Sequence, residues 1–481
     1  MKIKQILQNI DTENNIKSIL EDEITDIIFD SRKVIKDCVF VCVKGEKSDG
    51  HLFAKTAQEK GAKYILAEYQ TDSSLPHIIV KDSRRALSLM CANFNGNPQD
   101  KLKFIGITGT NGKTTITYII KSMLENMGKK VGLIGTIQNM IGDNVFPAGY
   151  STPEPYELFG LLKKMADEKV DYVVMEVTSH ALSQDRVYNI PYEVGVFTNL
   201  TQDHLDFHKT MENYLEAKTK LFKVCKKGII NIDDKASEYI IENACCEIMT
   251  YSAKYDKGQL VAKNIEYYPD KVKFIAVMQG EIGRAQFETP GEFSVSNALA
   301  SIGAVISLGF SFDEALEGLK KAKGVKGRAE VVPVNKDYTV IIDYAHTPDS
   351  LEKIITSISN VSEGRIVTLF GCGGDRDAAK RPIMGKIAEK YSDFVIVTSD
   401  NPRTEDPEKI IDDILKGIKG KNNIKVITDR KEAIKYALEN AKKGDIIILA
   451  GKGHETYQIT NQGKIHFDER EIINDILKDL K

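Results

Sequence analysis

The sequence predicts an α/β protein built from several domains. Its 481 residues exceed the length that one hydrophobic core usually supports, so two to four domains are expected. Short apolar runs alternate with helical patterns in the first hundred residues, around residue 105, and again through the last third of the chain. This alternation is typical of sheets whose parallel strands are joined by helices.

The composition is that of an ordinary globular protein, and it argues against several functions. A formal net charge of -3 gives no electrostatic reason to bind nucleic acid or an anionic membrane. Residues 1–10 lack the apolar core of a signal peptide, and no apolar run approaches the ~18 residues of a membrane span. The seven cysteines form no CxxC pair, so neither a disulfide framework nor a zinc site is indicated. We therefore expect a cytoplasmic protein, and we expect it to be a monomer.

One stretch has the pattern of a phosphate-binding loop. The apolar run Lys103-Phe-Ile-Gly-Ile107 predicts a buried strand, and Thr108-Gly-Thr-Asn-Gly-Lys-Thr-Thr115 predicts a tight loop. Apolar residues at helical spacing follow, and Gly128 is a plausible helix end. Such a loop points backbone N–H groups and the positive end of a helix dipole at one place, which suits a polyphosphate.

Two side chains of this loop would complete a nucleotide site. Lys113 would neutralise the terminal phosphates, and Thr114 would offer its hydroxyl to Mg²⁺. The strict motif has a glycine where this chain has Ile107. The succession of strand, loop and helix nevertheless predicts nucleotide binding.

The first hundred residues predict a small α/β unit with strands at 24–29, 38–43, 64–67 and 77–80. Two turns, Asp30-Ser31-Arg32 and residues 45–51, each follow a strand. Polar groups and free N–H donors at such places could hold a charged ligand, although ordinary surface turns would look the same. Residues 95–98, Asn-Gly-Asn-Pro, form a natural linker to the nucleotide strand.

Two polar residues accompany apolar strands further along. Glu176 lies inside the predicted strand 173–177, where an unpaired carboxylate is costly. A metal ion would satisfy it, and so would a buried hydrogen bond; once the phosphate loop is accepted, we favour the metal. His204 follows the predicted strand 196–200, at the end where ligands gather in parallel sheets. A purely structural role is equally consistent with its position.

Residues 211–222 predict an amphipathic helix with a lysine on its apolar face. Helical spacing puts four residues on that face and turns Lys220 elsewhere; the four are Tyr214, Lys218, Leu221 and Phe222. A lysine in such a place usually extends its ammonium to solvent. Alternatively, desolvation lowers its pKa and leaves a neutral amine that can react with CO₂. The resulting carbamate would carry a negative charge suited to Mg²⁺.

The pattern becomes irregular after about residue 240, with short strands predicted over 251–289 and a helix opening at Phe293. We predict a domain boundary near residue 330, before a strand at 338–342. Three later strands, at 365–370, 394–398 and 446–450, run into charged loops at 371–377, 400–403 and 451–455. Because such loops meet at one edge of a parallel sheet, they imply a second ligand-binding edge.

These motifs resemble those of the Mur ligases, the ATP-dependent amide-forming enzymes that build the peptide of bacterial peptidoglycan. The matching landmarks run through nearly the whole chain and, in this order, are highly specific: Thr108-Gly-Thr-Asn-Gly-Lys-Thr-Thr115, Glu176, Asp203-His204, Ala217-Lys218, Asn297, Gly327-Arg328, Asp343-Tyr-Ala-His346 and Gly373-Gly-Asp-Arg376. Within the family, the chain is most similar to the branch that adds the third amino acid. The supporting stretches are Asp30-Ser-Arg32, Ser151-Thr-Pro-Glu154 and Glu176-Val-Thr-Ser-His180.

The loop Asp400-Asn-Pro-Arg403 resembles that of the enzymes which add diaminopimelate rather than lysine. Diaminopimelate differs from lysine by a second carboxylate, and Arg403 offers a bidentate partner for one. The resemblance thus implies a ligase that joins meso-2,6-diaminopimelate to the D-glutamate carboxylate of UDP-N-acetylmuramoyl-L-Ala-D-Glu. The reaction would pass through an acyl phosphate and would serve cytoplasmic peptidoglycan precursor synthesis.

The resemblance also implies three domains and their ligands. Residues 1–98 would bind the UDP-sugar, residues 99–330 would form the central ATP-binding domain, and residues 331–481 would form a Rossmann-like domain for the amino acid. The residues carried over for the UDP-sugar peptide are Ser31, Glu46, Lys47, Ser48, Ser151, Thr152, Thr178, Ser179, Gln184 and Arg186. Those for ATP are Gly109, Thr110, Asn111, Gly112, Lys113, Thr114, Thr115, Asn297, Arg328 and Asp343. Those for diaminopimelate are Arg381, Asp400, Asn401, Pro402, Arg403, Gly451 and Glu455.

The implied catalytic residues are Lys113, Glu176, His204 and Lys218. The implied ligands of Mg²⁺ are Thr114, Glu176, His204 and Lys218, the last as N6-carboxylysine.

Two departures from the family pattern are mild: Thr178 stands where a serine is common, and Phe293-Ser294 lacks the usual asparagine. Three alternatives stay open, namely a lysine-adding ligase, an enzyme like folylpolyglutamate synthase, and a non-enzymatic P-loop protein. The loop at 400–403 and the N-terminal turns argue against the first two. The combination of Glu176, His204 and Lys218 argues against the third.

Overall fold

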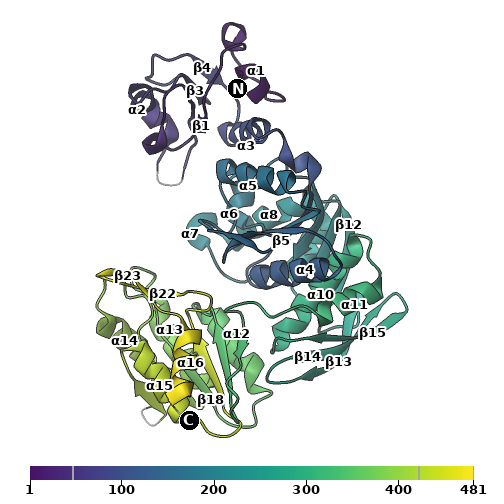
Figure 1. Ribbon diagram of the computed structural model, residues 1–481, viewed down its shortest axis with the longest axis vertical. Helices are drawn as coiled ribbons and strands as arrows, with labels where there is room; N and C mark the ends of the chain where they lie inside the picture. The colour runs from purple at the N-terminus through teal and green to yellow at the C-terminus, as the bar shows by residue number, and fades with distance from the viewer. Residues whose placement is uncertain (46–47, 421–422, 480–481) are drawn as a thin grey trace. The chain divides into compact units, whose positions relative to one another are not determined.

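The computed structural model describes residues 1–45, 48–420 and 423–479, and the chain divides into two compact units, Met1–Met249 and Thr250–Lys481. Each unit combines sheets with helices, which confirms the predicted α/β class (Figure 1). The division into three domains at residues 98 and 330 stays a prediction. None of the helices in the described ranges reaches the combination of length and hydropathy that a membrane span requires.

The first unit opens with a small parallel sheet. Its elements are α1 (Ile3–Ile6), η1 (Lys17–Ile19), β1 (Ile27–Ile28), η2 (Ser31–Lys33), β2 (Val39–Val41), η3 (Gly50–Phe53), α2 (Ala54–Glu59), β3 (Tyr64–Ala67), β4 (His77–Ile79), α3 (Ser83–Phe94) and η4 (Pro98–Lys101). The strand order is β1-β2-β3-β4. Val39 and Val41 face a core shared with α1 and α3, whereas Phe40 and Ile65 face α2. All four predicted strands are present, and β1 is much shorter than predicted.

The centre of the first unit is a second, larger sheet. Its elements are β5 (Lys103–Thr108), α4 (Lys113–Asn126), β6 (Val131–Ile134), β7 (Asn139–Ile141), β8 (Asn144–Phe146), α5 (Pro155–Asp167), β9 (Tyr172–Glu176), α6 (Ser179–Ser183), β10 (Tyr192–Phe197), α7 (Leu205–His208), α8 (Met211–Thr219), η5 (Lys220–Lys223), β11 (Lys227–Asn231) and α9 (Ala236–Asn243). In this unit the strands follow the order β11-β10-β5-β9-β6-β7-β8. β5 runs parallel to both β10 and β9, so the loops after these three strands emerge at one edge.

The second unit contains an antiparallel meander and a mostly parallel sheet. Its elements are β12 (Glu247–Ser252) at the junction, β13 (Leu260–Tyr267), β14 (Val272–Met278), β15 (Glu281–Phe287), α10 (Glu292–Ser307), α11 (Phe312–Lys320), β16 (Glu330–Val332), β17 (Thr339–Asp343), α12 (Pro348–Ser359), β18 (Ile366–Phe370), α13 (Lys380–Tyr391), β19 (Phe394–Val397), α14 (Pro407–Leu415), β20 (Ile424–Val426), α15 (Arg430–Glu439), β21 (Ile446–Ala450), β22 (Tyr457–Thr460), β23 (Gly463–His466) and α16 (Glu469–Asp479). The larger sheet has the order β16-β17-β21-β18-β19-β20. Its faces form two cores, one with α12, α13 and α14 and the other with α15 and α16.

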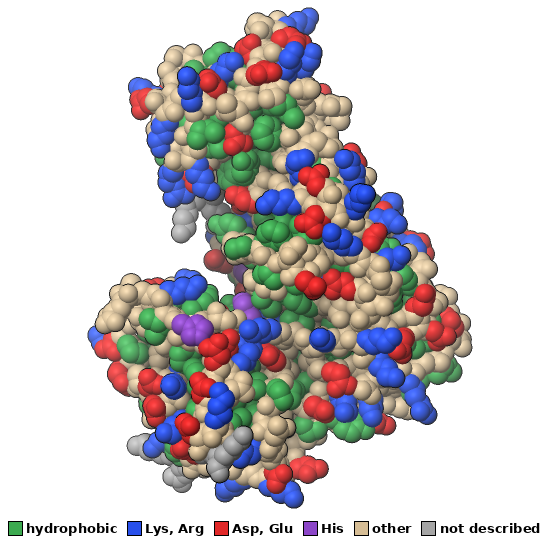
Figure 2. Space-filling model, viewed as in Figure 1, with side chains coloured by type: hydrophobic (Ala, Val, Ile, Leu, Met, Phe, Trp, Pro, Cys, Tyr) green, Lys and Arg blue, Asp and Glu red, His purple; other side chains and the backbone are tan. Residues whose placement is uncertain are grey.

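Charged side chains of both signs are mixed over the surface that Figure 2 shows. Among the described side chains on this face, Lys and Arg alternate with Asp and Glu, in keeping with the formal net charge of -3. Proteins that bind nucleic acid through their backbone phosphates typically concentrate Lys and Arg on one face. The electrostatics of this face therefore do not favour a polyanionic partner.

A buried ion pair fixes the ends of two strands in the larger sheet of the second unit. Arg430 is 1% exposed, and its Nε donates to Glu469 Oε1 at 2.8 Å. Its Nη2 donates to the Ala450 carbonyl at 2.9 Å, and its Nη1 to the Ser399 carbonyl at 3.5 Å. Burial raises the pKa of Glu469, so its charge depends on this guanidinium. Arg430 thereby positions the residues that directly precede Asp400 and Gly451.

We expect Arg430→Met to lower the free energy of unfolding by about 3–5 kcal/mol, because it leaves a buried carboxylate without its cation. Denaturant titration, followed by circular dichroism, measures the change. The double variant Arg430→Met with Glu469→Leu should recover most of the loss, since apolar replacement of both partners is often neutral. A single variant as stable as the wild-type protein would show that the pair does not hold these strands.

Candidate active site

The motif at residues 108–115 forms the predicted loop between β5 and α4. Gly109 has φ 145° and Gly112 has φ 88°, values that glycine adopts most readily. A Cβ atom at Gly109 would lie 1.8 Å from Thr198 Oγ1, so no larger residue fits there without movement. α4 begins at Lys113, and its N-terminus therefore faces the loop.

Two residues that sequence reasoning missed hold the loop in place. Asn111 N donates to Asn199 Oδ1 at 3.0 Å, and Asn199 Nδ2 donates back to the Asn111 carbonyl at 3.2 Å. Thr198 Oγ1 donates to the same carbonyl at 2.6 Å. The sequence predicted that this strand ends near residue 200. β10 instead ends at Phe197, because Thr198 and Asn199 make these contacts with the loop. The sequence signal that could have identified Thr198 and Asn199 is the polar run that follows an apolar strand.

The Lys113 ammonium lies over the loop itself. Its Nζ donates to the carbonyls of Gly109, at 2.9 Å, and Thr110, at 2.8 Å. The Thr110 hydroxyl lies 3.3 Å from the Tyr214 hydroxyl. The lysine is thus at the place where a bound polyphosphate would require positive charge.

Glu176 ends β9 and is 1% exposed. Its Oε1 accepts hydrogen bonds from Thr114 Oγ1 at 2.9 Å and from Thr136 N at 2.8 Å. Its Oε2 accepts from Thr136 Oγ1 at 2.9 Å. Buried hydrogen bonds therefore satisfy the carboxylate, as one of the two sequence-based alternatives predicted. Thr136, which sequence reasoning missed, lies two residues after the end of β6.

Lys218 is 1% exposed, so the interpretation that its ammonium reaches solvent is wrong. Its Nζ donates to the Gly109 carbonyl at 2.9 Å and lies 4.2 Å from the centre of the Tyr214 ring. Leu221 and Phe222 are also buried, which confirms the predicted apolar face. Burial, reinforced by the nearby Lys113 charge, holds the pKa of Lys218 well below its usual value. The structure therefore agrees with the alternative of a neutral amine.

His204 lies at the entrance to this group. It has φ 53°, and its side chain is 46% exposed. Its ring packs edge-on against His180, with centroids 4.8 Å apart. Desolvation lowers the pKa of His204, the Asp203 carboxylate opposes this effect, and the charge of Lys113 lowers the pKa further. The structure thus brings these three predicted catalytic residues into electrostatic range of one another.

Several residues predicted to bind the sugar peptide surround the end of β9. Thr152 Oγ1 donates to the Glu176 carbonyl at 2.8 Å, and Arg186 Nη1 donates to the Thr152 carbonyl at 3.2 Å. Arg186 Nη2 also pairs with Glu154 at 2.8 Å. The remaining contacts are Thr152 with Thr178 at 3.2 Å, Arg186 with Gln184 at 2.6 Å and Ser151 with Thr136 at 2.7 Å.

Ser179 pairs with a histidine that sequence reasoning missed. Its hydroxyl lies 2.9 Å from His208 Nε2, and both residues are buried. Burial lowers the pKa of His208 to about 4.

In the N-terminal part, Ser31 begins η2 and Ser48 is exposed, whereas Glu46 and Lys47 lie outside the described residues.

The ATP residues predicted after position 249 belong to the second unit. Asp343 ends β17 and accepts hydrogen bonds from Ala329 N at 2.7 Å and Ala345 N at 2.8 Å. The Arg328 guanidinium lies 4.7 Å from the centre of the Tyr344 ring. Asn297 is 7% exposed within α10. Their contact with ATP stays a prediction.

The three charged loops of the second unit meet as predicted. Asn401 Nδ2 donates to Glu455 Oε2 at 2.8 Å, and a Cβ at Gly451 would lie 2.6 Å from Asp400 Oδ2. Arg403, with φ 56°, donates from Nη1 to the Gly374 carbonyl at 2.8 Å. Pro402, which lies between Asn401 and Arg403 in the chain, is buried. Apart from Arg381, the residues predicted to bind diaminopimelate therefore form one cluster.

Arg381 lies outside this group of contacts, because two nitrogens of its guanidinium pair with protein carboxylates. It is 2% exposed, with Nη2 donating to Glu405 at 2.8 Å and Nη1 to Asp413 at 3.0 Å. Its direct contact with a ligand stays a prediction.

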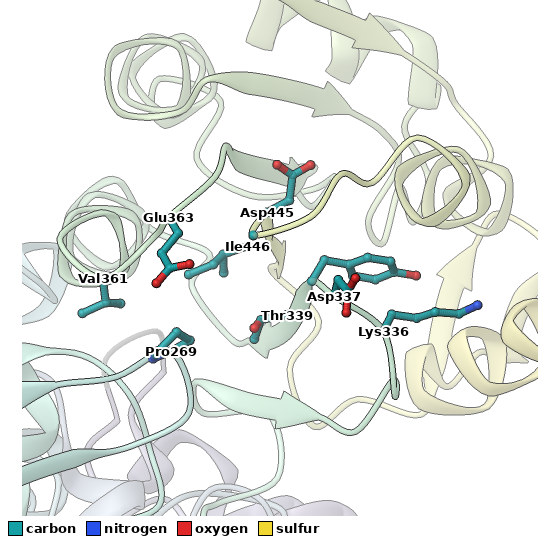
Figure 3. Close-up of a pocket in the computed structure, with 10 residues that line it drawn as sticks. Pro269, Lys336, Asp337, Thr339, Val361, Glu363, Asp445 and Ile446 are labelled. Atoms are coloured by element: carbon teal, nitrogen blue, oxygen red, sulfur yellow. The ribbon is translucent and has the colours of Figure 1, made fainter.

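A cavity of about 130 Å³ lies in the second unit, where strands of its larger sheet begin. Its lining includes Thr339 and Ile446, where β17 and β21 begin, with Val361 and Glu363 on one side and Lys336 on the other (Figure 3). The predicted site residues follow the carboxyl ends of these strands, so the cavity is separate from them.

Comparisons with known proteins agree with the resemblance. The model of the Mur ligase family catalytic domain matches residues 23–94, that of the Mur ligase middle domain 107–305, and that of the Mur ligase glutamate ligase domain 327–453. The UDP-N-acetylmuramoyl-L-alanyl-D-glutamate--2,6-diaminopimelate ligase 1 of Clostridium acetobutylicum is 49% identical, over 100% of both chains. The ligase of that name from Clostridium tetani is 47% identical, again over 100% of both. A solved structure of such a ligase superposes with a TM-score of 0.74 at 30% identity, covering 100% of this chain and 99% of that one. The chain belongs to the Mur ligase family.

Proposed function

We propose that this protein is an ATP-dependent ligase that adds meso-2,6-diaminopimelate to UDP-N-acetylmuramoyl-L-Ala-D-Glu in peptidoglycan precursor synthesis. The observation that carries the proposal is the meeting of the phosphate loop, the Glu176 carboxylate and the buried Lys218 at one edge of the central sheet. Full-length similarity to ligases that bear the name of this reaction supports it. We place the reaction in the cytoplasm, where ATP is available, and propose a monomer, since one chain supplies every predicted site residue.

The first half of the reaction activates the D-glutamate carboxylate. One of its oxygens attacks the γ-phosphorus of ATP, which gives an acyl phosphate and releases ADP. The backbone N–H groups of residues 109–115 and the N-terminus of α4 would bind the phosphates. The Lys113 ammonium, which now donates to two loop carbonyls, would turn to the phosphate oxygens and offset the charge that develops there.

The oxygen atoms near the loop fit a magnesium ion. The Thr114 hydroxyl and the Glu176 carboxylate lie 2.9 Å apart, and Mg²⁺ prefers such ligands together with phosphate oxygens and water. In the described part of the chain, no group of three or more His, Cys, Asp or Glu side chains forms a ready-made metal site. Thr114 and Glu176 would hold one ion, and His204 with carbamylated Lys218 would hold or orient a second. Bound Mg²⁺ would neutralise phosphate charge.

The second half of the reaction forms the amide. The diaminopimelate amine attacks the activated carbonyl, and phosphate leaves from the tetrahedral intermediate. Asp400 and Glu455 are carboxylates suited to the ammonium groups of the amino acid. Arg403 is suited to its second carboxylate, because a guanidinium can bind both oxygens of one carboxylate.

We expect phosphate release from ATP to require the UDP-muramoyl dipeptide and to favour meso-diaminopimelate over L-lysine by about 100-fold in kcat/KM. The loss of one charged hydrogen-bonded pair, worth about 1.5–3 kcal/mol, accounts for a preference of this order. Arg403→Lys should reduce the preference. A preference for lysine would overturn the assignment of the acceptor, and release with neither amino acid would overturn the ligase.

We expect Lys218→Ala to lower kcat on the order of 100-fold, since it removes charge beside the phosphate loop. A small carboxylic acid should restore part of the activity, whereas bicarbonate should not, because the variant has no amine to carbamylate. Lys220→Ala, in the adjoining turn, is the matched control and should keep wild-type activity. Full activity in Lys218→Ala would refute the importance of this residue.

A further inference from the structure

A fully buried lysine lies behind the predicted amino-acid site. Lys452 follows β21 and is 0% exposed. Charged side chains are almost never fully buried unless they are paired. Its Nζ donates to Asn401 Oδ1 at 3.1 Å and to Glu455 Oε2 at 3.3 Å, and it lies 5.7 Å from the centre of the Phe467 ring. The charge of Lys452 is thus directed at two residues of the site.

Lys452 and a backbone N–H group together determine which way the Asn401 amide points. An ammonium can only donate hydrogen bonds, so the group that faces it must be the amide oxygen. Ile459 N donates to the same oxygen at 2.9 Å. The amide nitrogen then necessarily points to Glu455 Oε2, to which it donates at 2.8 Å. The orientation of Asn401 therefore follows from the lysine and the Ile459 N–H together, and the lysine is the side chain that also contacts Glu455.

The same contacts divide the two oxygens of Glu455. Oε2 receives both Lys452 Nζ and Asn401 Nδ2. No residue in the described ranges donates a hydrogen bond to Oε1. Because Oε2 already has two donors, Oε1 is the oxygen left for an additional donor. An ammonium group of an amino acid is a donor of the right kind.

We propose that Lys452 is a positioning residue of the amino-acid site, which holds Asn401 and Glu455 so that Glu455 Oε1 receives an ammonium group of the substrate. The inference rests on the proposed function, because it takes diaminopimelate as the ligand. It adds a residue that touches no substrate and acts through Glu455, which it holds directly and by way of Asn401. At metal sites, loss of a residue that supports a ligand typically costs 10–100-fold in affinity or activity, and we expect an effect at the lower end of that range here.

The test is Lys452→Met, which keeps an unbranched apolar side chain and removes the charge and the donor. The KM for diaminopimelate should rise about 10-fold, whereas kcat and the KM values for ATP and the UDP-muramoyl dipeptide should stay within about 2-fold. A general defect of folding would instead lower kcat. Lys478→Met removes an exposed lysine that pairs with Asp475 and should change none of these constants.

A double-mutant cycle with Glu455→Gln tests whether Lys452 acts through Glu455. If it does, adding Lys452→Met to Glu455→Gln should raise the KM for diaminopimelate by less than about 2-fold. A full 10-fold increase in that background would overturn the inference. The cycle also covers the case in which Lys452→Met alone does not fold, because Glu455→Gln removes the carboxylate that would be left without its cation.

Failure of the inference and failure of the proposed function give different results. A wild-type protein that releases no phosphate with diaminopimelate would refute the function. An active Lys452→Met variant with an unchanged KM for diaminopimelate would refute only the role of Lys452.

Discussion

The buried Glu176 carboxylate is the interaction on which the central site depends. An ionised carboxylate away from water is costly unless every oxygen finds a donor. Here the donors come from the first turn of α4, through Thr114, and from the loop after β6, through Thr136. Satisfying one charge therefore fixes three chain segments at the edge of the sheet. This requirement fixes the end of the phosphate loop at Thr114, and Thr198 and Asn199 hold its centre at Asn111.

The second unit uses buried cations for the same purpose. Arg430 donates to the carbonyls of Ser399 and Ala450, and Lys452 donates to Asn401 and Glu455. Arg430 ties the loop after β19 to the last residue of β21, and Lys452 ties the same loop to the loop after β21. A buried charge has to be paired within a short distance. Apolar packing builds the sheet, but it specifies the loops poorly. The buried charges supply the specificity at the edge where the site residues gather.

Local patterns predicted the elements well and their long-range partners poorly. The strand, loop and helix around Lys113 follow from glycine placement and helical spacing, and β3 and β21 have the predicted bounds. The end of β10 was misplaced because Asn199 bonds to Asn111, which lies 88 residues away in the chain. Thr136, His208 and Lys452 were missed for the same reason. No periodicity marks a residue whose role is to pair with a distant group.

The protonation of Lys218 decides the charge balance around the phosphate loop. Lys113 and Lys218 both donate to the Gly109 carbonyl, and two ammonium groups so close together repel each other. Lys113 has the second loop carbonyl as an acceptor and Lys218 is the more deeply buried, so the pKa of Lys218 is the one that falls well below its usual value. A neutral Lys218 removes the repulsion, and a carbamate would reverse its sign. The loop would then face the Lys113 cation and the Lys218 carbamate. The cation suits a bound phosphate, and the carbamate suits the metal ion that accompanies it.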